Sequence, residues 1–137
     1  MSTLNRYSKT LMDIYSIVKD FEIENIKIVP VGFKGTESPT EYVRFNPVFS
    51  EKPILNNLKG ILYFDIFTLN GAGPTRALLI ADLIEKYFAG KSFESVDTIS
   101  NTQFSPQSNL VVKGEDKNPA FILTTYQIQF NNFRKDL

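Results

Sequence analysis

A short glycine-rich turn stands directly before a predicted helix, an arrangement that can bind phosphate. Gly71-Ala72-Gly73 follows a run of apolar residues and precedes Pro74-Thr75-Arg76. Backbone N–H groups at a helix N-terminus attract anions. A P-loop also needs a lysine followed by serine or threonine at the helix start, and a dinucleotide-binding turn needs a third glycine. Both are missing, so the pattern favours a tight turn that leads into a helix.

The acidic residues near this turn do not form a recognisable catalytic pair. Asp82 and Glu85 share one face of the predicted helix, but Asp82 also stands four residues before Lys86, the spacing of an ordinary ion pair on a solvated helix. Asp65 interrupts an apolar strand. It is either a buried, paired carboxylate or a residue at the rim of the sheet. Without a histidine nearby, neither site indicates acid–base catalysis.

The composition excludes several kinds of function. The 137 residues contain no cysteine and no histidine, which rules out disulfides, thiol nucleophiles and Cys- or His-based metal sites. The formal net charge is +0, with 15 basic and 15 acidic residues, so the basic footprint of a nucleic-acid-binding protein is missing. We therefore expect no enzyme, no catalytic, cofactor-binding or metal-ligating residue, and no recognition of nucleic-acid sequence.

Hydropathy predicts a soluble protein made in a cytoplasm. The first ten residues are polar and lack the apolar core of a signal peptide. No apolar run approaches the roughly 20 residues that span a bilayer, so we expect no membrane partner. The length predicts a single domain over residues 1–137.

The first half of the chain predicts one helix and two strands. Apolar residues recur at spacings of three and four over residues 3–21, which indicates an amphipathic helix. The stripe comprises Leu4, Tyr7, Leu11, Ile14, Val18 and Phe21. Ile26–Phe33 predicts a strand, and Pro30 places it at an edge or a bulge. Glu41–Phe49 predicts a second strand, which Pro47 ends or bends.

The central stretch, Lys59–Gly90, predicts a strand, a turn and a helix. Ile61–Leu69 is apolar on both faces, as in a largely buried strand. The helix after Pro74 has its own apolar stripe, which Leu79 and Leu83 widen to roughly 200°. One sheet face does not need so much apolar surface. A neighbouring subunit is the expected cover.

The last third predicts further strands. Thr98–Phe104 indicates a strand, Ser105–Asn109 a turn, and Ala120–Phe133 a long closing strand, with Asn131–Leu137 as a polar tail. Lys91–Thr98 is mostly polar, and Ser50–Leu58 predicts a connection. Together the elements predict an α+β fold: a two-layer, mostly antiparallel β-sheet with two α-helices packed on one face.

Several stretches, taken in order, resemble the tail terminator (tail completion) proteins of long-tailed bacteriophages. The segment from Tyr42 to Phe45 resembles the early strand of that family, and the segment from Gly60 to Phe67 resembles its central strand. The turn from Gly71 to Pro74, the helix around residues 81–88 and the closing strand at 120–130 continue the likeness. The arrangement extends over residues 3–133, with the strongest motifs in the central third.

The resemblance implies a structural virion protein without cofactors. Such proteins form a hexameric ring on the head-proximal end of the tail tube, stop tube polymerisation and offer a joining surface to the head-completion or connector protein. The expected partners are therefore other copies of the chain, the tail tube protein and the connector. Candidate subunit-interface residues are Leu79, Leu83, Arg44 and Glu41. Candidate loop contacts to tube or connector are Lys34, Gly35, Glu37, Lys113, Glu115, Asp116 and Lys117.

Two alternatives remain at the level of sequence. The first is another phage neck, head-closure or minor tail component, which differs in its binding partner. The second is a small enzyme or ligand-binding protein, which needs a deep pocket with convergent polar groups near Asp65 or the turn at residues 71–75.

Overall fold

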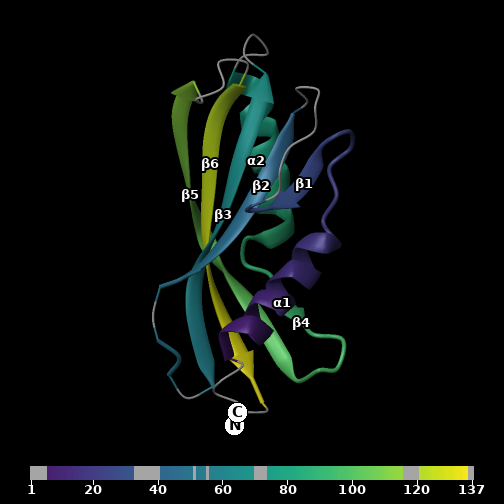
Figure 1. The fold of residues 1–137 in the computed structure, drawn as a ribbon, viewed down its shortest axis with the longest axis vertical. Helices are drawn as coiled ribbons and strands as arrows, with labels where there is room; N and C mark the ends of the chain where they lie inside the picture. The colour runs from purple at the N-terminus through teal and green to yellow at the C-terminus, as the bar shows by residue number, and fades with distance from the viewer. Residues whose placement is uncertain are drawn as a thin grey trace.

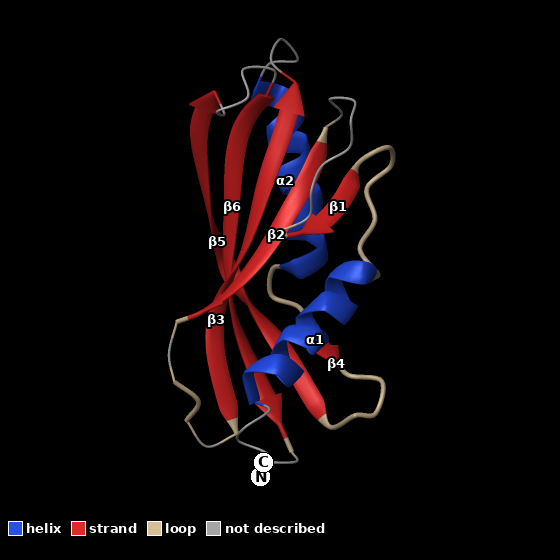
Figure 2. Ribbon diagram, viewed as in Figure 1, coloured by secondary structure: helices blue, strands red, loops and turns tan. Residues whose placement is uncertain are grey.

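The chain folds around one long, strongly twisted β-sheet, shown in Figures 1 and 2. The computed structural model describes residues 6–32, 41–50, 52–54, 56–69, 74–115 and 121–135. In chain order the elements are α1 (Arg6–Lys19), β1 (Lys27–Pro30), β2 (Tyr42–Phe49), β3 (Asn57–Leu69), α2 (Pro74–Phe88), β4 (Ser92–Glu94), β5 (Ser100–Glu115) and β6 (Phe121–Arg134).

The sheet has six strands in the order β1-β2-β3-β6-β5-β4. β1 pairs with β2 in parallel, and the other neighbouring strands pair antiparallel. Two helices and a mostly antiparallel sheet make an α+β fold, which confirms the fold class predicted from the sequence. Pro30 ends β1, the edge strand, as its missing N–H predicts.

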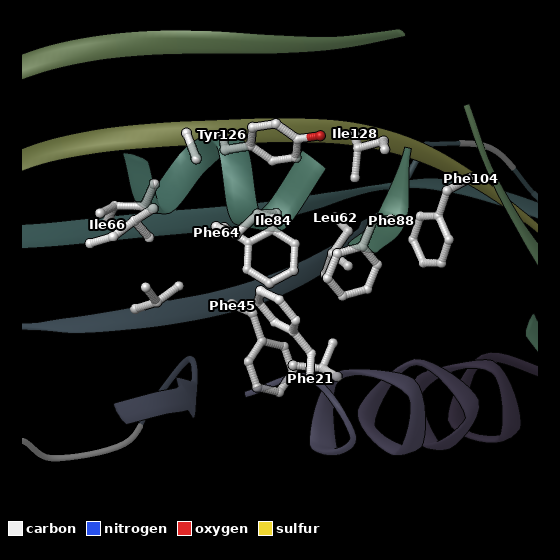
Figure 3. Packing of buried hydrophobic residues seen from close by; sticks show 14 of the residues in the cluster. Phe21, Phe45, Leu62, Phe64, Ile66, Ile84, Phe88, Phe104, Tyr126 and Ile128 are labelled. Carbon is white, nitrogen blue, oxygen red and sulfur yellow. The ribbon is translucent and has the colours of Figure 1, made fainter. Parts of the chain in front are cut away.

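The hydrophobic core forms on one face of the sheet, where alternate side chains of neighbouring strands meet. Phe45, Phe64 and Tyr126 are consecutive register partners across β2, β3 and β6, so their side chains share this face. Tyr15 of α1 contacts Phe45, with ring centroids 5.1 Å apart. Phe88 of α2 contacts Phe64 at the same centroid distance of 5.1 Å. Figure 3 shows part of this hydrophobic cluster, including Phe45, Phe64, Phe88 and Tyr126.

Helix α2 buries the stripe that its sequence period predicts. Its buried residues are Ala77, Ile80, Ala81, Ile84 and Phe88. Phe88 lies at the centre of an aromatic cluster, with ring centroids 5.3 Å from Phe21 and 5.2 Å from Phe104. Gly90 follows with a φ of 69°, the left-handed conformation in which glycine commonly ends a helix.

The segment around Pro106 is part of a strand, contrary to the predicted turn over residues 105–109. β5 continues from Ser100 to Glu115, and its register with β6 shifts between Phe104 and Ser108. Proline is tolerated in a strand at such an irregularity because no ladder hydrogen bond is lost there. A short strand, β4, also forms in the segment that looked mostly polar.

Two further boundaries differ from the prediction. β3 begins at Asn57, so its first residues were wrongly assigned to a connection, and Leu58 is fully buried. β2 ends at Phe49 as predicted, and Pro47 does not end the strand. β6 extends to Arg134, so most of the predicted polar tail is strand. The tail looked solvated because its residues are polar, but two of them are buried.

Helix α1 buries two polar residues in place of two predicted apolar ones. Arg6 and Thr10 are 1% and 0% exposed, whereas Tyr7 is 45% exposed and Leu11 is half-buried. The second half of the helix behaves as predicted, because Ile14 and Val18 are buried. The buried stripe of α1 therefore consists of polar side chains in the first half of the helix and apolar side chains in the second half.

The polar half of α1 faces Asn132 at the end of β6. Arg6 donates from Nη1 to Asn132 Oδ1 at 2.8 Å and from Nη2 to the Asn132 carbonyl at 2.6 Å. Asn132 Nδ2 donates to Thr102 Oγ1 at 2.7 Å and to Asp13 Oδ2 at 3.2 Å. Arg134 Nη1 donates to the same Asp13 oxygen at 2.9 Å. Because these polar groups satisfy one another, they can remain buried.

Candidate interaction surfaces

The outward face of α2 carries three exposed leucines. Leu78, Leu79 and Leu83 are 42%, 57% and 46% exposed. Leu79 and Leu83 are one helical turn apart, so they form a continuous apolar strip on the helix surface. The sequence identified these two as surplus apolar surface, and the structure leaves them in solvent. Leu78 was missed, although it also falls outside the buried stripe.

Glu41 and Arg76 form an ion pair beside this strip. Arg76 Nε lies 2.5 Å from Glu41 Oε1, and the backbone N–H of Leu69 donates to the other carboxylate oxygen at 3.1 Å. The pair therefore ties the first turn of α2 to the residue before β2. Glu41 was predicted as a subunit contact. Its partners here belong to its own chain, and contact with a second subunit stays a prediction.

Arg44 and Asp65 pair on the opposite face of the sheet from the helices. Arg44 Nη2 lies 3.2 Å from Asp65 Oδ2, and Thr125 donates to Asp65 Oδ1 at 2.7 Å. The guanidinium also lies over the Phe67 ring, 5.0 Å from its centroid. Asp65 is thus a partly buried, paired carboxylate, one of the two outcomes that the sequence left open. This paired arrangement does not indicate a general acid or base.

The predicted loop contacts cannot be assembled into one surface. Lys34, Gly35, Glu37, Asp116 and Lys117 lie outside the described residues. The backbone at Lys113 and Glu115 belongs to β5, and the structure does not describe their side chains. Their contact with the tail tube or the connector stays a prediction.

An open groove of about 1120 Å³ lies between α1 and β1. Tyr15 and Lys19 line it from α1, and Lys27 and Ile28 line it from β1. Glu22 adds an acidic group to the lining. The groove thus combines apolar walls with charges of both signs. It does not include Asp65, where the enzyme hypothesis places its polar groups.

The side chains of Tyr126 and Asp97 have shifted pKa values, and each shift has a local cause. Burial raises the pKa of the Tyr126 phenol, and the carboxylate of Glu85 acts in the same direction. A hydrogen bond from the Ser95 hydroxyl lowers the pKa of Asp97, which lies on the surface. Neither group has the nucleophile–base geometry of a catalytic site.

Within the described part of the chain, no cluster of three or more acidic residues is arranged to hold a metal ion. Among the same residues, neither helix has the length and apolar character needed to cross a membrane.

No protein-family model matches the sequence, and no curated protein matches it. One solved structure, whose name describes no function, superposes with a TM-score of 0.67. The match covers 94% of this chain and 94% of the other, at 11% sequence identity. Because the identity is so low, this likeness establishes a shared fold and nothing about function.

Proposed function

We propose that this protein is a structural virion subunit that assembles as a ring on the head-proximal end of a bacteriophage tail tube. There it ends tube polymerisation and presents a joining surface to the head connector. The observation that carries the proposal is the strip formed by Leu79 and Leu83 on α2, two large exposed apolar side chains one helical turn apart. Exposed apolar patches on a soluble domain mark places where other proteins bind.

A ring of identical subunits requires two different surfaces on each subunit. The leucine strip offers one of them. The groove between α1 and β1 offers the other, with room for apolar side chains and a rim that carries Lys19, Glu22 and Lys27. The charges on α2, which include Asp82 and Lys86, are suited to this mixed rim and would fix the register of the contact.

The proposal needs no cofactor and no turnover, in agreement with a chain that has no histidine or cysteine. Its partners are other copies of the chain, six to a ring by the family resemblance, then the tail tube protein and the connector. A head-closure protein would share the fold class but bind the portal side. The binding partner therefore distinguishes these two candidates.

The deciding experiment is electron microscopy of the purified chain, alone and mixed with tail tube protein. We expect rings or caps at tube ends and uniform tube lengths. Bare tube ends with unregulated lengths would contradict the tail-terminator function. Binding to portal-side adaptor instead of tube would favour the head-closure alternative.

Leu83→Asp tests the leucine strip directly. Because Leu83 is exposed, the substitution should change the free energy of unfolding by no more than about 0.5 kcal/mol while abolishing rings and caps. Met12→Asp is the matched control, since Met12 is an exposed apolar residue of α1 (71%) that lies outside the strip. Normal capping by Leu83→Asp would show that the strip is not part of the interface. Unfolding of this variant would show that Leu83 belongs to the core.

A further inference from the structure

The two lateral edges of the sheet differ in their capacity to accept another strand. On one side, the N–H of Val31 donates to the carbonyl of Phe45 at 2.9 Å. The backbone groups of Phe45 therefore point outward, and those of Pro47, two residues on, do the same. Val31 directs its N–H toward β2, so the backbone groups of the adjacent residue, Pro30, point away from β2 and toward the outside of the sheet. Each proline removes the N–H that an added strand would need, so this edge is blocked.

The opposite edge is open along much of β5. β4 covers only Asn101–Gln103, and the Phe104 N–H donates outward to the Lys91 carbonyl at 2.9 Å. Beyond Ser105, which accepts from the Gly90 N–H, none of the described residues forms a backbone hydrogen bond with the outer side of β5.

The register shows which groups of β5 point outward. Phe104, Ser108 and Leu110 oppose Phe130, Ile128 and Tyr126, which are alternate residues of β6. Alternate residues of a strand direct their backbone groups to the same side, so Ser108 and Leu110 point outward as Phe104 does. Asn109 and Val111 direct theirs toward β6.

The side chains at this edge are unusually apolar for an uncovered strand. Leu110 and Val111 are 37% and 38% exposed. Helix α2 lies alongside, because Glu85 accepts a hydrogen bond from the Ser108 hydroxyl. Leu78, two turns before Glu85 on the same side of α2, is also exposed. The only proline of β5, Pro106, lies outside the segment 108–112, and an exposed, apolar strand edge without proline in the pairing segment is a site for strand addition.

We propose that β5 pairs antiparallel with β5 of a second copy of this chain, about a two-fold axis at Val111. This register aligns the apolar segment 110–112 of one copy with the same segment of the other. A second copy is the occupant that the edges favour, because an isologous contact uses one edge twice. A head-to-tail pairing would need the edge that Pro30 and Pro47 block. The inference uses the sheet edge and stands apart from the proposed ring contact through Leu79 and Leu83.

A cysteine scan tests the axis, since the chain contains no other thiol. Opposed residues of an antiparallel pair that do not share hydrogen bonds approach closely enough for a disulfide. Val111→Cys should therefore form a disulfide-linked dimer rapidly under mild oxidation. Val48→Cys, at an exposed position on the blocked edge, is the control and should remain monomeric. Equal or faster cross-linking at position 48 would overturn the proposal.

Sedimentation equilibrium of the full chain tests the pairing itself. Leu110→Pro removes an outward N–H without touching the hydrogen bonds to β6, and it should raise the dimer dissociation constant by at least about tenfold. Leu110→Ala keeps the N–H and should weaken the dimer less. A wild-type chain that is monomeric at every concentration, or a folded Leu110→Pro that dimerises normally, would overturn the proposal. If Leu110→Pro fails to fold, the cysteine scan decides.

Discussion

The two ends of the protein core are built from different kinds of side chain. One end, the aromatic end, is formed by Phe88 and three rings that contact it, Phe21, Phe64 and Phe104. The other, the polar end, is the network of Arg6, Thr10, Asp13, Asn132 and Arg134, together with Ser100 and Thr102. Helix α1 supplies Arg6 and Thr10 to the polar end, and its Ile14 and Val18 belong to the same hydrophobic cluster as the four phenylalanines.

The difference lies in what holds each end together. The aromatic end needs only apolar side chains of suitable volume, since its stability comes from area removed from water. The polar end depends on each donor meeting its acceptor, because an unsatisfied buried polar group costs more than a hydrogen bond contributes. The aromatic end should therefore tolerate conservative changes, and the polar end should not.

The largest expected effect is the loss of an aromatic ring. Phe88→Ala should lower the free energy of unfolding by about 3–5 kcal/mol, because Phe88 is fully buried and its removal leaves a cavity. Chemical denaturation followed by circular dichroism measures the change. Phe133→Ala is the control, since Phe133 is 40% exposed, and it should cost much less. Equal costs would show that the aromatic cluster is not the main source of stability.

The polar end should respond almost as strongly to a smaller change. Asn132→Ala leaves Arg6, Thr10 and Thr102 without their common partner, and we expect a loss of about 3 kcal/mol. Asn131→Ala makes the same chemical change one residue away, on the opposite face of β6. It should cost roughly 0.5 kcal/mol or less. If Asn132→Ala were as mild as its neighbour, water would have to replace the network, and the contrast between the two ends would disappear.

The same contrast explains why the sequence predicts which residues are buried at the aromatic end but not at the polar end. Apolar periodicity marks Ile80, Ile84 and Phe88 as buried without knowledge of their partners. No local pattern marks Asn132 or Arg134, because polar residues near the end of a chain resemble a solvated tail. Their partners, Arg6 and Asp13, lie more than a hundred positions away. Polar burial is a property of pairs and cannot be derived from one segment.

The candidate interface shows a similar division. The surplus width of the α2 stripe was enough to predict that Leu79 and Leu83 lie outside the core. Glu41 and Arg44 could not be placed in the same way, because their partners Arg76 and Asp65 stand 35 and 21 positions away. β5 was divided in the prediction because proline and serine normally indicate a turn, and only the pairing with β6 shows the strand to be continuous.

The smallest expected effect concerns the phenol of Tyr126, whose ring lies beside Phe64 of the aromatic end. Burial raises the pKa of Tyr126, so the folded state favours the protonated phenol. Its contribution to stability is complete below about pH 10, the usual pKa of tyrosine, and is lost as the pH rises through the folded-state pKa. Urea denaturation between pH 7 and pH 11 should show a shallower decline for Tyr126→Phe than for wild type. Parallel profiles would mean that the folded protein accommodates the charged phenolate as well as it does the neutral phenol.

The hydrogen bonds between Arg6 and Asn132 have a consequence for how the chain acquires its structure during synthesis. These residues are separated by 126 positions, so α1 cannot complete its contacts until β6 has been translated. Until then Arg6 and Thr10 can hydrogen-bond each other within α1 but lack their contacts to Asn132. Contacts of such large sequence separation slow folding. The N-terminal helix should therefore be among the last elements to be fixed in place, although it is made first.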